Sequence, residues 1–134
     1  MKLPRRKVAR AFIFDINQKL FLIVKGSLPP FMYHLPGGGI GKNESAENAV
    51  RREIEEELNI KPNNISSVSF LYKVNTTVLC IPHEMDIFLI QVMNFDLKLS
   101  WEISSSKWVT FEELKKELDK DSLLGIDNLS YLVN

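Results

Sequence analysis

The sequence has little cysteine, no excess of charge and no long apolar run. Its one cysteine, Cys80, has no disulfide partner within the 134 residues; a lone thiol agrees with a reducing compartment, so we expect a cytoplasmic protein. Seventeen basic residues balance 17 acidic ones, which argues against strong nucleic-acid binding because such proteins carry a basic excess. The longest apolar stretches, such as Ile87 to Ile90, are far shorter than the roughly 20 residues that span a membrane. We therefore expect no membrane association, and no signal peptide is apparent.

Glycine and proline are also sparse, with six residues of each, which excludes a fibrous or linker-like chain. The hydrophobic fraction of 45% is too high for a disordered chain. A chain of this length corresponds to one domain with a substantial core. Because we find no repeat, low-complexity tract or linker, we expect a single domain over residues 1–134, of undetermined oligomeric state.

Strand-like stretches alternate with helical ones along the chain. The second of three expected helical segments, over residues 111–118, begins with a capping box of Thr110 and Glu113, and a third, shorter one lies within residues 123–133. Strands interspersed with separate helices predict a mixed α/β or α+β fold. The expected strands cover residues 8–14, 19–25, 31–35, 67–78, 85–94 and 108–109.

The first and longest helix is expected over residues 45–58, where apolar residues recur at helical spacing. Ser45 is a suitable N-cap, and Asn59 a suitable stop because asparagine tolerates the left-handed conformation. This segment is strongly acidic, since six acidic and two basic residues between Glu44 and Glu57 leave a net charge of minus four.

Three carboxylates of this helix share one face. Glu53, Glu56 and Glu57 stand at positions i, i+3 and i+4, so they repel one another unless a cation lies between them. Hard oxygen ligands without a nearby cysteine or histidine favour Mg²⁺ or Mn²⁺ over zinc. Arg52 precedes the cluster and is placed to orient a carboxylate. Taken alone, however, a glutamate-rich helix is more often an ordinary solvated face.

The glycine run before the helix is equally unspecific by itself. Gly37 to Gly39 lacks the spacing of a phosphate-binding P-loop and of the dinucleotide-binding fingerprint. The glycine run and the acidic helix are informative when they are taken together. Residues Gly38 to Ile60 resemble the signature of the MutT/Nudix hydrolase family, G-x5-E-x7-R-E-U-x-E-E-x-G-U, in which U is a bulky aliphatic residue. Asn59 departs from it, where the signature has glycine, and asparagine is the next best residue for a left-handed helix stop. The eight matching positions are Gly38, Glu44, Arg52, Glu53, Ile54, Glu56, Glu57 and Ile60.

The resemblance implies a fold and a reaction. The fold is an α/β/α sandwich around a mixed β-sheet, and the reaction is the metal-dependent hydrolysis of a nucleoside diphosphate derivative by attack of water on a phosphorus. Mg²⁺ or Mn²⁺ held by the three glutamates would neutralise the charge that develops on the phosphoryl oxygens. The resemblance adds the carbonyl of Gly37 as a metal ligand. Gly38 and Glu44 are expected to order the loop and the start of the helix, Glu44 by pairing with Arg52.

The general base has two candidates. Glu102, six residues before Trp108, resembles the family's loop glutamate that binds a further metal ion or acts as base; the alternative is an exposed loop acid. If Glu102 binds metal, Glu53 is the preferred base.

Residues outside the signature are weaker candidates. Tyr33 and Phe31 precede the glycines and are placed to stack on a nucleobase, with simple packing as the alternative. Asn128 lies near where some members of the family place a base-reading amide. We expect Cys80 to be buried and inert, and Trp108, Phe111 and Leu114 to lie in the core.

The choice of substrate class is narrowed mostly by subfamily residues that this chain lacks. The ADP-ribose type has a proline where this chain has Asn75, and the dinucleoside-polyphosphate type has a tyrosine where it has Thr76, Thr77 and Val78. We therefore expect a small-molecule substrate of the MutT-like class, a nucleoside triphosphate, oxidised ones included, cleaved to monophosphate and pyrophosphate. ADP-ribose or a nucleotide sugar is the alternative within catalysis, and a non-catalytic nucleotide-binding or partner-binding module is the alternative outside it.

Overall fold

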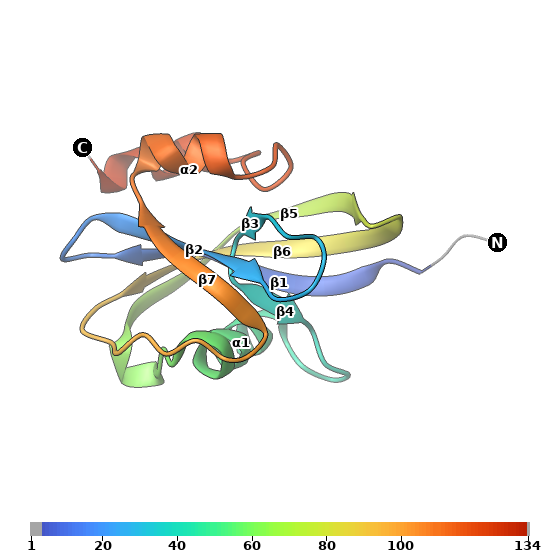
Figure 1. Ribbon diagram of the computed structural model, residues 1–134, viewed down its shortest axis with the longest axis horizontal. Coiled ribbons are helices and arrows are strands. Elements are labelled where there is room, and N and C mark those ends of the chain that lie inside the picture. Colours follow the sequence, from blue (N-terminus) through green and yellow to red (C-terminus); the bar gives the residue numbers. More distant parts are fainter. Residues whose placement is uncertain (1–3, 134) are drawn as a thin grey trace.

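A computed structural model describes residues 4–133, and their strands form one mixed sheet between two helical layers (Figure 1). Helix α1 (Ala46–Leu58) covers one face, while α2 (Phe111–Glu117) and the 3₁₀ helix η2 (Ile126–Leu132) cover the other. A 3₁₀ turn, η1 (Pro62–Asn64), follows α1. None of the helices in residues 4–133 is long and apolar enough to cross a membrane. The strands are β1 (Arg6–Asp15), β2 (Leu20–Gly26), β3 (Tyr33–His34), β4 (Gly37–Gly39), β5 (Ile65–Val78), β6 (Ile81–Val92) and β7 (Ile103–Val109).

Strand β1 is central to the sheet. It runs parallel to β6 and antiparallel to β2 and β4, in a sheet of order β3-β2-β1-β6-β5 in which β7 also pairs with β2. Its side chains alternate between two cores, as the period of a strand requires. Phe12 and Phe14 pack on the α2 side, and Ala11 and Ile13 on the α1 side. The mixed sheet covered on both faces confirms the expected α/β sandwich.

Helix α1 has the predicted ends. The Ser45 hydroxyl accepts a hydrogen bond from the Asn48 amide at 3.1 Å, and Asn59 adopts the left-handed conformation with φ 66°. The Asn59 side chain also makes a hydrogen bond that glycine could not make, because its Nδ2 donates to the carbonyl of Asp96 at 2.8 Å. The departure from the family signature therefore ties the end of α1 to the segment before β7.

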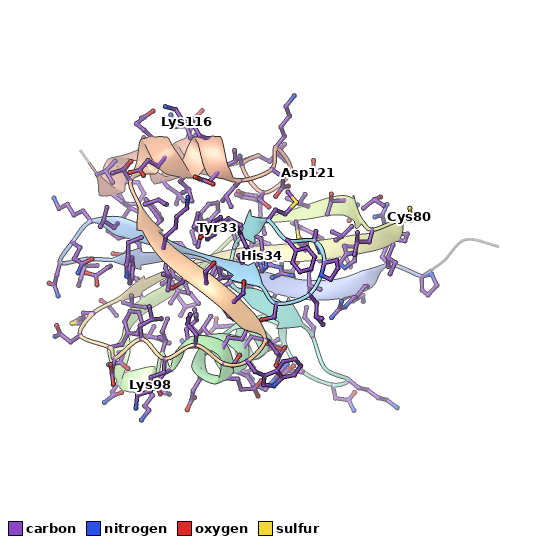
Figure 2. The ribbon with its side chains drawn as sticks, in the orientation of Figure 1. Tyr33, His34, Cys80, Lys98, Lys116 and Asp121 are labelled. Atoms are coloured by element: carbon purple, nitrogen blue, oxygen red, sulfur yellow. The ribbon has the colours of Figure 1, made fainter. Side chains whose placement is uncertain are left out.

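Some expectations from the sequence were wrong in detail, among them the bounds of several strands. Gly37–Gly39, expected as part of a loop, is a strand that pairs with β1. The pairing is so close that a Cβ on Gly37 (φ 141°) would overlap the Ala9 carbonyl. Strand β7 begins at Ile103, five residues earlier than expected. Cys80 is exposed in the turn between β5 and β6 (Figure 2), where it has a φ of 67° and no core to enter.

The expected core residues of the C-terminal half are placed as predicted in two cases of three. Phe111 and Leu114 lie on the buried face of α2, and Thr110 and Glu113 form the predicted capping box at its start. Trp108 is only partly buried, against the core on the α1 side, where its ring lies 6.0 Å from that of Phe95.

Candidate active site

The glycines of β4 and the acidic face of α1 lie against each other. A Cβ built on Gly38 would come within 2.5–2.8 Å of the carboxylate atoms of Glu53, so the bare backbone of Gly38 forms one wall of the space that holds Glu53. The Glu53 side chain is 16% exposed and Glu57 is 7% exposed, whereas the Glu56 side chain is 59% exposed. The structure therefore turns two of the three predicted carboxylates toward β4 and leaves the third outside.

Arg52 connects the acidic residues to the loop before the helix. It binds both carboxylate oxygens of Glu44, donates from Nη2 to the Gly39 carbonyl at 3.1 Å, and donates from Nη1 to Glu53 at 2.9 Å. Its contact with Glu56 is longer, at 3.5 Å. The hydrogen bonds from Arg52 and from the Gly41 amide hold the pKa of Glu44 down at about 2. Arg52 thus fixes the orientation of the loop and of Glu53.

Glu57 is in an unfavourable electrostatic setting. Burial, followed by the nearby charge of Glu53, raises its pKa to about 8; Glu102 acts in the same direction and the Arg10 guanidinium opposes it. The Oε1 atom of Glu57 is buried without a hydrogen-bond partner among the described residues. A buried carboxylate oxygen in this state is costly unless something else binds it.

Glu102 belongs to a segment separate from α1 and the glycine strand. It lies in the turn immediately before β7 and is exposed, and its carbonyl accepts a hydrogen bond from the Ser27 amide at 2.9 Å. Its charge adds to that of Glu53 in raising the pKa of Glu57. Its role as metal ligand or base remains a prediction.

The donor set fits a hard divalent cation, which is the cofactor that the family resemblance implies. The Glu57 carboxylate, one of whose oxygens is unpartnered among the described residues, lies beside the backbone of Gly37, and the repelling carboxylates of Glu53 and Glu102 would each gain from a shared positive charge. Within residues 4–133, however, no three acidic, histidine or cysteine side chains are gathered into a cluster. Arg52 donates to both Glu53 and Glu56, at 2.9 and 3.5 Å.

A cavity of about 660 Å³ opens on the α2 side of the sheet, a size that suits a nucleotide-sized ligand. Tyr33 lines it, with the ammonium groups of Lys25 and Lys107 lying 4.7 and 4.4 Å from its ring centre. Figure 2 shows Tyr33 and His34 on β3, and Asp121 in the loop after α2; all three line this cavity. Phe31 and Asn128 are exposed and are not among the described residues that line it.

Two residues of this cavity were missed by sequence reasoning. Arg10 lies on its floor, in the buried part of β1, and His34 lies beside it with its Nδ1 3.2 Å from Arg10 Nη1. Burial and the neighbouring guanidinium lower the pKa of His34 to about 4. The available signal was a charged residue between Ala9 and Ala11 in an otherwise apolar strand.

The sequence of this chain is similar to those of known proteins. The NUDIX domain model matches residues 4–127. The RNA pyrophosphohydrolases of Salmonella newport (strain SL254) and Haemophilus influenzae (strain PittEE) are 30% and 26% identical to this chain over 97 residues; each match covers 59% of this chain, and 55% and 50% of the relative, respectively. The chain thus spans about half the length of the curated relatives it matches.

Solved structures show the same fold. The binary complex of a C. elegans Ap4A hydrolase superposes with a TM-score of 0.80 at 23% identity, covering 96% of this chain and 97% of that one. The MutT protein from Methanosarcina mazei Go1 gives a TM-score of 0.78 at 22% identity, with coverages of 98% and 96%. Since the family model spans the sheet, the glycine strand and the acidic helix, this chain belongs to the NUDIX domain family.

Proposed function

We propose that this protein hydrolyses the pyrophosphate linkage of a nucleoside diphosphate derivative with the help of Mg²⁺ or Mn²⁺, and that its substrate is a nucleoside triphosphate, released as monophosphate and pyrophosphate. The observation that carries the proposal is the buried Glu57 carboxylate, which has one oxygen unpartnered among the described residues and lies beside the glycine strand and Glu53. An ordinary solvated helix face has no reason to bury such a group.

The residues of the site divide cation binding, proton transfer and orientation between them. Glu53 and Glu57, with the Gly37 carbonyl, would hold the cation, which when bound neutralises phosphoryl charge and lowers the pKa of water. Glu102 accepts a proton from the attacking water; if Glu102 instead binds the cation, Glu53 is the base. Arg52 holds Glu53 in one orientation.

In this proposal the cavity on the α2 side binds the nucleoside part of the substrate. Arg10 links it to the glycine strand beside the acidic residues, because Arg10 lines the cavity and donates to the carbonyl of Gly37 at 3.3 Å. Tyr33 on its wall offers an aromatic ring to a nucleobase if the ammonium groups of Lys25 and Lys107, which lie over the ring, move aside.

RNA with a pyrophosphate linkage is a second candidate substrate. The observation in its favour is that the curated relatives are named RNA pyrophosphohydrolases. The balanced charge of the chain weighs against extensive RNA contacts, so we rank it below a free nucleotide.

The test is release of phosphate or pyrophosphate from a substrate panel, with and without Mg²⁺. The panel contains nucleoside triphosphates, oxidised nucleotides, ADP-ribose, nucleotide sugars, dinucleoside polyphosphates and 5′-triphosphorylated RNA. Glu57→Gln should lower turnover by at least about a hundredfold, because it removes charge that binds the cation. Glu55→Gln is the matched control, since Glu55 is exposed on the same helix.

The outcomes separate the alternatives. Turnover that requires both Mg²⁺ and Glu57 supports the proposal, and the preferred substrate names the class. Near-normal activity of Glu57→Gln would show that the metal site is elsewhere. No turnover of any member of the panel would favour a non-catalytic nucleotide-binding module.

A further inference from the structure

Arg10 presents unused hydrogen-bond donors to the cavity. Its Nη1 donates to the carbonyls of Leu35 at 3.0 Å and Gly37 at 3.3 Å and lies 3.2 Å from His34 Nδ1. Its Nε and Nη2 have no hydrogen-bond partner in residues 4–133. Neither atom is among the unpartnered side-chain atoms that are fully buried, so both remain accessible. One edge of the guanidinium is therefore anchored, and the other is available to a ligand.

The same guanidinium lacks a direct ion pair. Among the described residues, no carboxylate lies within salt-bridge distance of Arg10, and burial lowers its pKa from the ordinary value. A buried cation bonded only to carbonyls and an imidazole is costly, and it gains from a ligand with hydrogen-bond acceptors. The open edge of Arg10 is thus suited to a pair of acceptor atoms.

The walls of the cavity favour a flat, largely apolar ring. The cavity is lined by Met32 and Tyr33 at β3, by Leu35 between β3 and β4, by Met85 of β6, and by Leu79 of the β5–β6 turn. These side chains provide the apolar and aromatic contacts that a planar heterocycle requires.

Two carboxylates in the same cavity argue against a phosphate group as the partner of Arg10. Asp119 accepts hydrogen bonds from the amide and hydroxyl of Ser122, and Asp121 accepts one from Thr76, so both are held in place. Both would repel a polyanion. A neutral ring with acceptors on one edge and donors on another has no such conflict.

We propose that Arg10 is a specificity-determining residue that donates two hydrogen bonds to O6 and N7 of a guanine base in this cavity, so that guanine nucleotides bind in preference to adenine nucleotides. Arginine pairs with these two acceptors of guanine, whereas adenine offers one acceptor and an amino group that repels the guanidinium. The N1 and N2 protons of guanine are donors for a carboxylate such as Asp119 or Asp121. The inference rests on the proposed function, because it assigns the base of that substrate.

The test measures equilibrium binding of GMP, AMP and 7-deaza-GMP by NMR titration or calorimetry in millimolar Mg²⁺. GMP should bind roughly fivefold or more tightly than AMP, as expected for a bidentate contact, and 7-deaza-GMP, which lacks the N7 acceptor, should bind several-fold more weakly than GMP. Arg10→Met should remove both differences. The matched control is Arg51→Met, which removes an arginine of α1 that pairs only with Glu47 among the described residues and should leave the preference intact.

Several results would overturn the inference. Equal affinity of the wild type for the three ligands, or no binding of GMP at millimolar concentration, would do so. An equal loss of GMP and AMP binding in Arg10→Met would show that Arg10 contacts phosphate instead. If Arg10→Met does not fold, the comparison of GMP with 7-deaza-GMP on the wild type still decides.

The proposed function is tested separately, because none of these ligands has a cleavable pyrophosphate linkage. Guanine-selective binding without turnover of any nucleotide would refute the hydrolase proposal alone. Turnover without a base preference would refute the role of Arg10 alone.

Discussion

Arg52 binds Glu44 through both carboxylate oxygens, with Nε–Oε2 and Nη2–Oε1 distances of 2.8 and 2.9 Å. Glu44 also accepts a hydrogen bond from the Gly41 amide at 2.8 Å. These bonds connect α1 to the loop that leaves the glycine strand, and the same guanidinium reaches Glu53. The geometry of the loop and the orientation of a predicted metal ligand therefore depend on one side chain.

Arg52→Lys should weaken both functions. A lysine ammonium cannot make the planar two-pronged contact with Glu44 while also reaching Gly39 and Glu53. We expect divalent-ion affinity or turnover to fall by about tenfold or more, as for other residues that orient metal ligands, together with a lower melting temperature. Calorimetric ion titration and thermal melts measure the two effects. Arg51→Lys, at an exposed i,i+4 pair with Glu47, should change neither, and an unaffected Arg52→Lys would contradict the assigned role.

Millimolar Mg²⁺ or Mn²⁺ should raise the melting temperature of the metal-free protein. The ion relieves the repulsion around Glu57 and binds only the folded state, which adds about 2.7 kcal/mol when its concentration is a hundred times its dissociation constant, a shift of several degrees. Glu57→Gln should lose most of the shift and Glu55→Gln should keep it. A melting temperature that neither ion changes would argue against the site.

The extent of α1 could be predicted because its information is local. Ala49, Val50 and Ile54 recur at helical spacing, and Ser45 and Asn59 mark the ends. The acidic face was likewise evident from spacing alone, although the sequence could not show that Glu56 points outward while Glu57 is buried.

Features that depend on distant pairing were missed. Three consecutive glycines indicate a loop, and only the pairing of Gly37–Gly39 with β1 makes them a strand. The cavity joins residues from β1, β3, the β5–β6 turn and the loop after α2, so no local pattern defines it. Cys80 was misplaced because cysteine is usually buried, whereas here it occupies a tight turn with positive φ.

His34 should contribute to the loss of stability in acid. Burial, followed by the charge of Arg10, lowers its pKa from 6.5 to about 4 in the folded protein. As the pH falls below 6.5 the unfolded chain takes up a proton that the folded protein does not, so stability decreases until the pH reaches about 4. His34→Gln removes this difference. Urea titrations at pH 7 and pH 5 measure how far the free energy of unfolding falls between the two pH values. The fall should be roughly 2 kcal/mol smaller in His34→Gln than in the wild type. Parallel pH dependence in the two proteins would contradict the assignment.

Gly38→Ala should separate the function of the site from the stability of the fold. The added Cβ would come within 2.5–2.8 Å of the Glu53 carboxylate, and Glu53 can move away because the end of a glutamate side chain is flexible. The backbone of β4 should therefore persist, with a melting temperature near that of the wild type, while the stabilisation by Mg²⁺ and the turnover fall markedly because Glu53 no longer occupies its position. Gly26→Ala is the matched control, since its Cβ would meet nothing closer than 3.6 Å. If Gly38→Ala retained full Mg²⁺ stabilisation and turnover, the contact between the glycine strand and Glu53 would have no part in the chemistry.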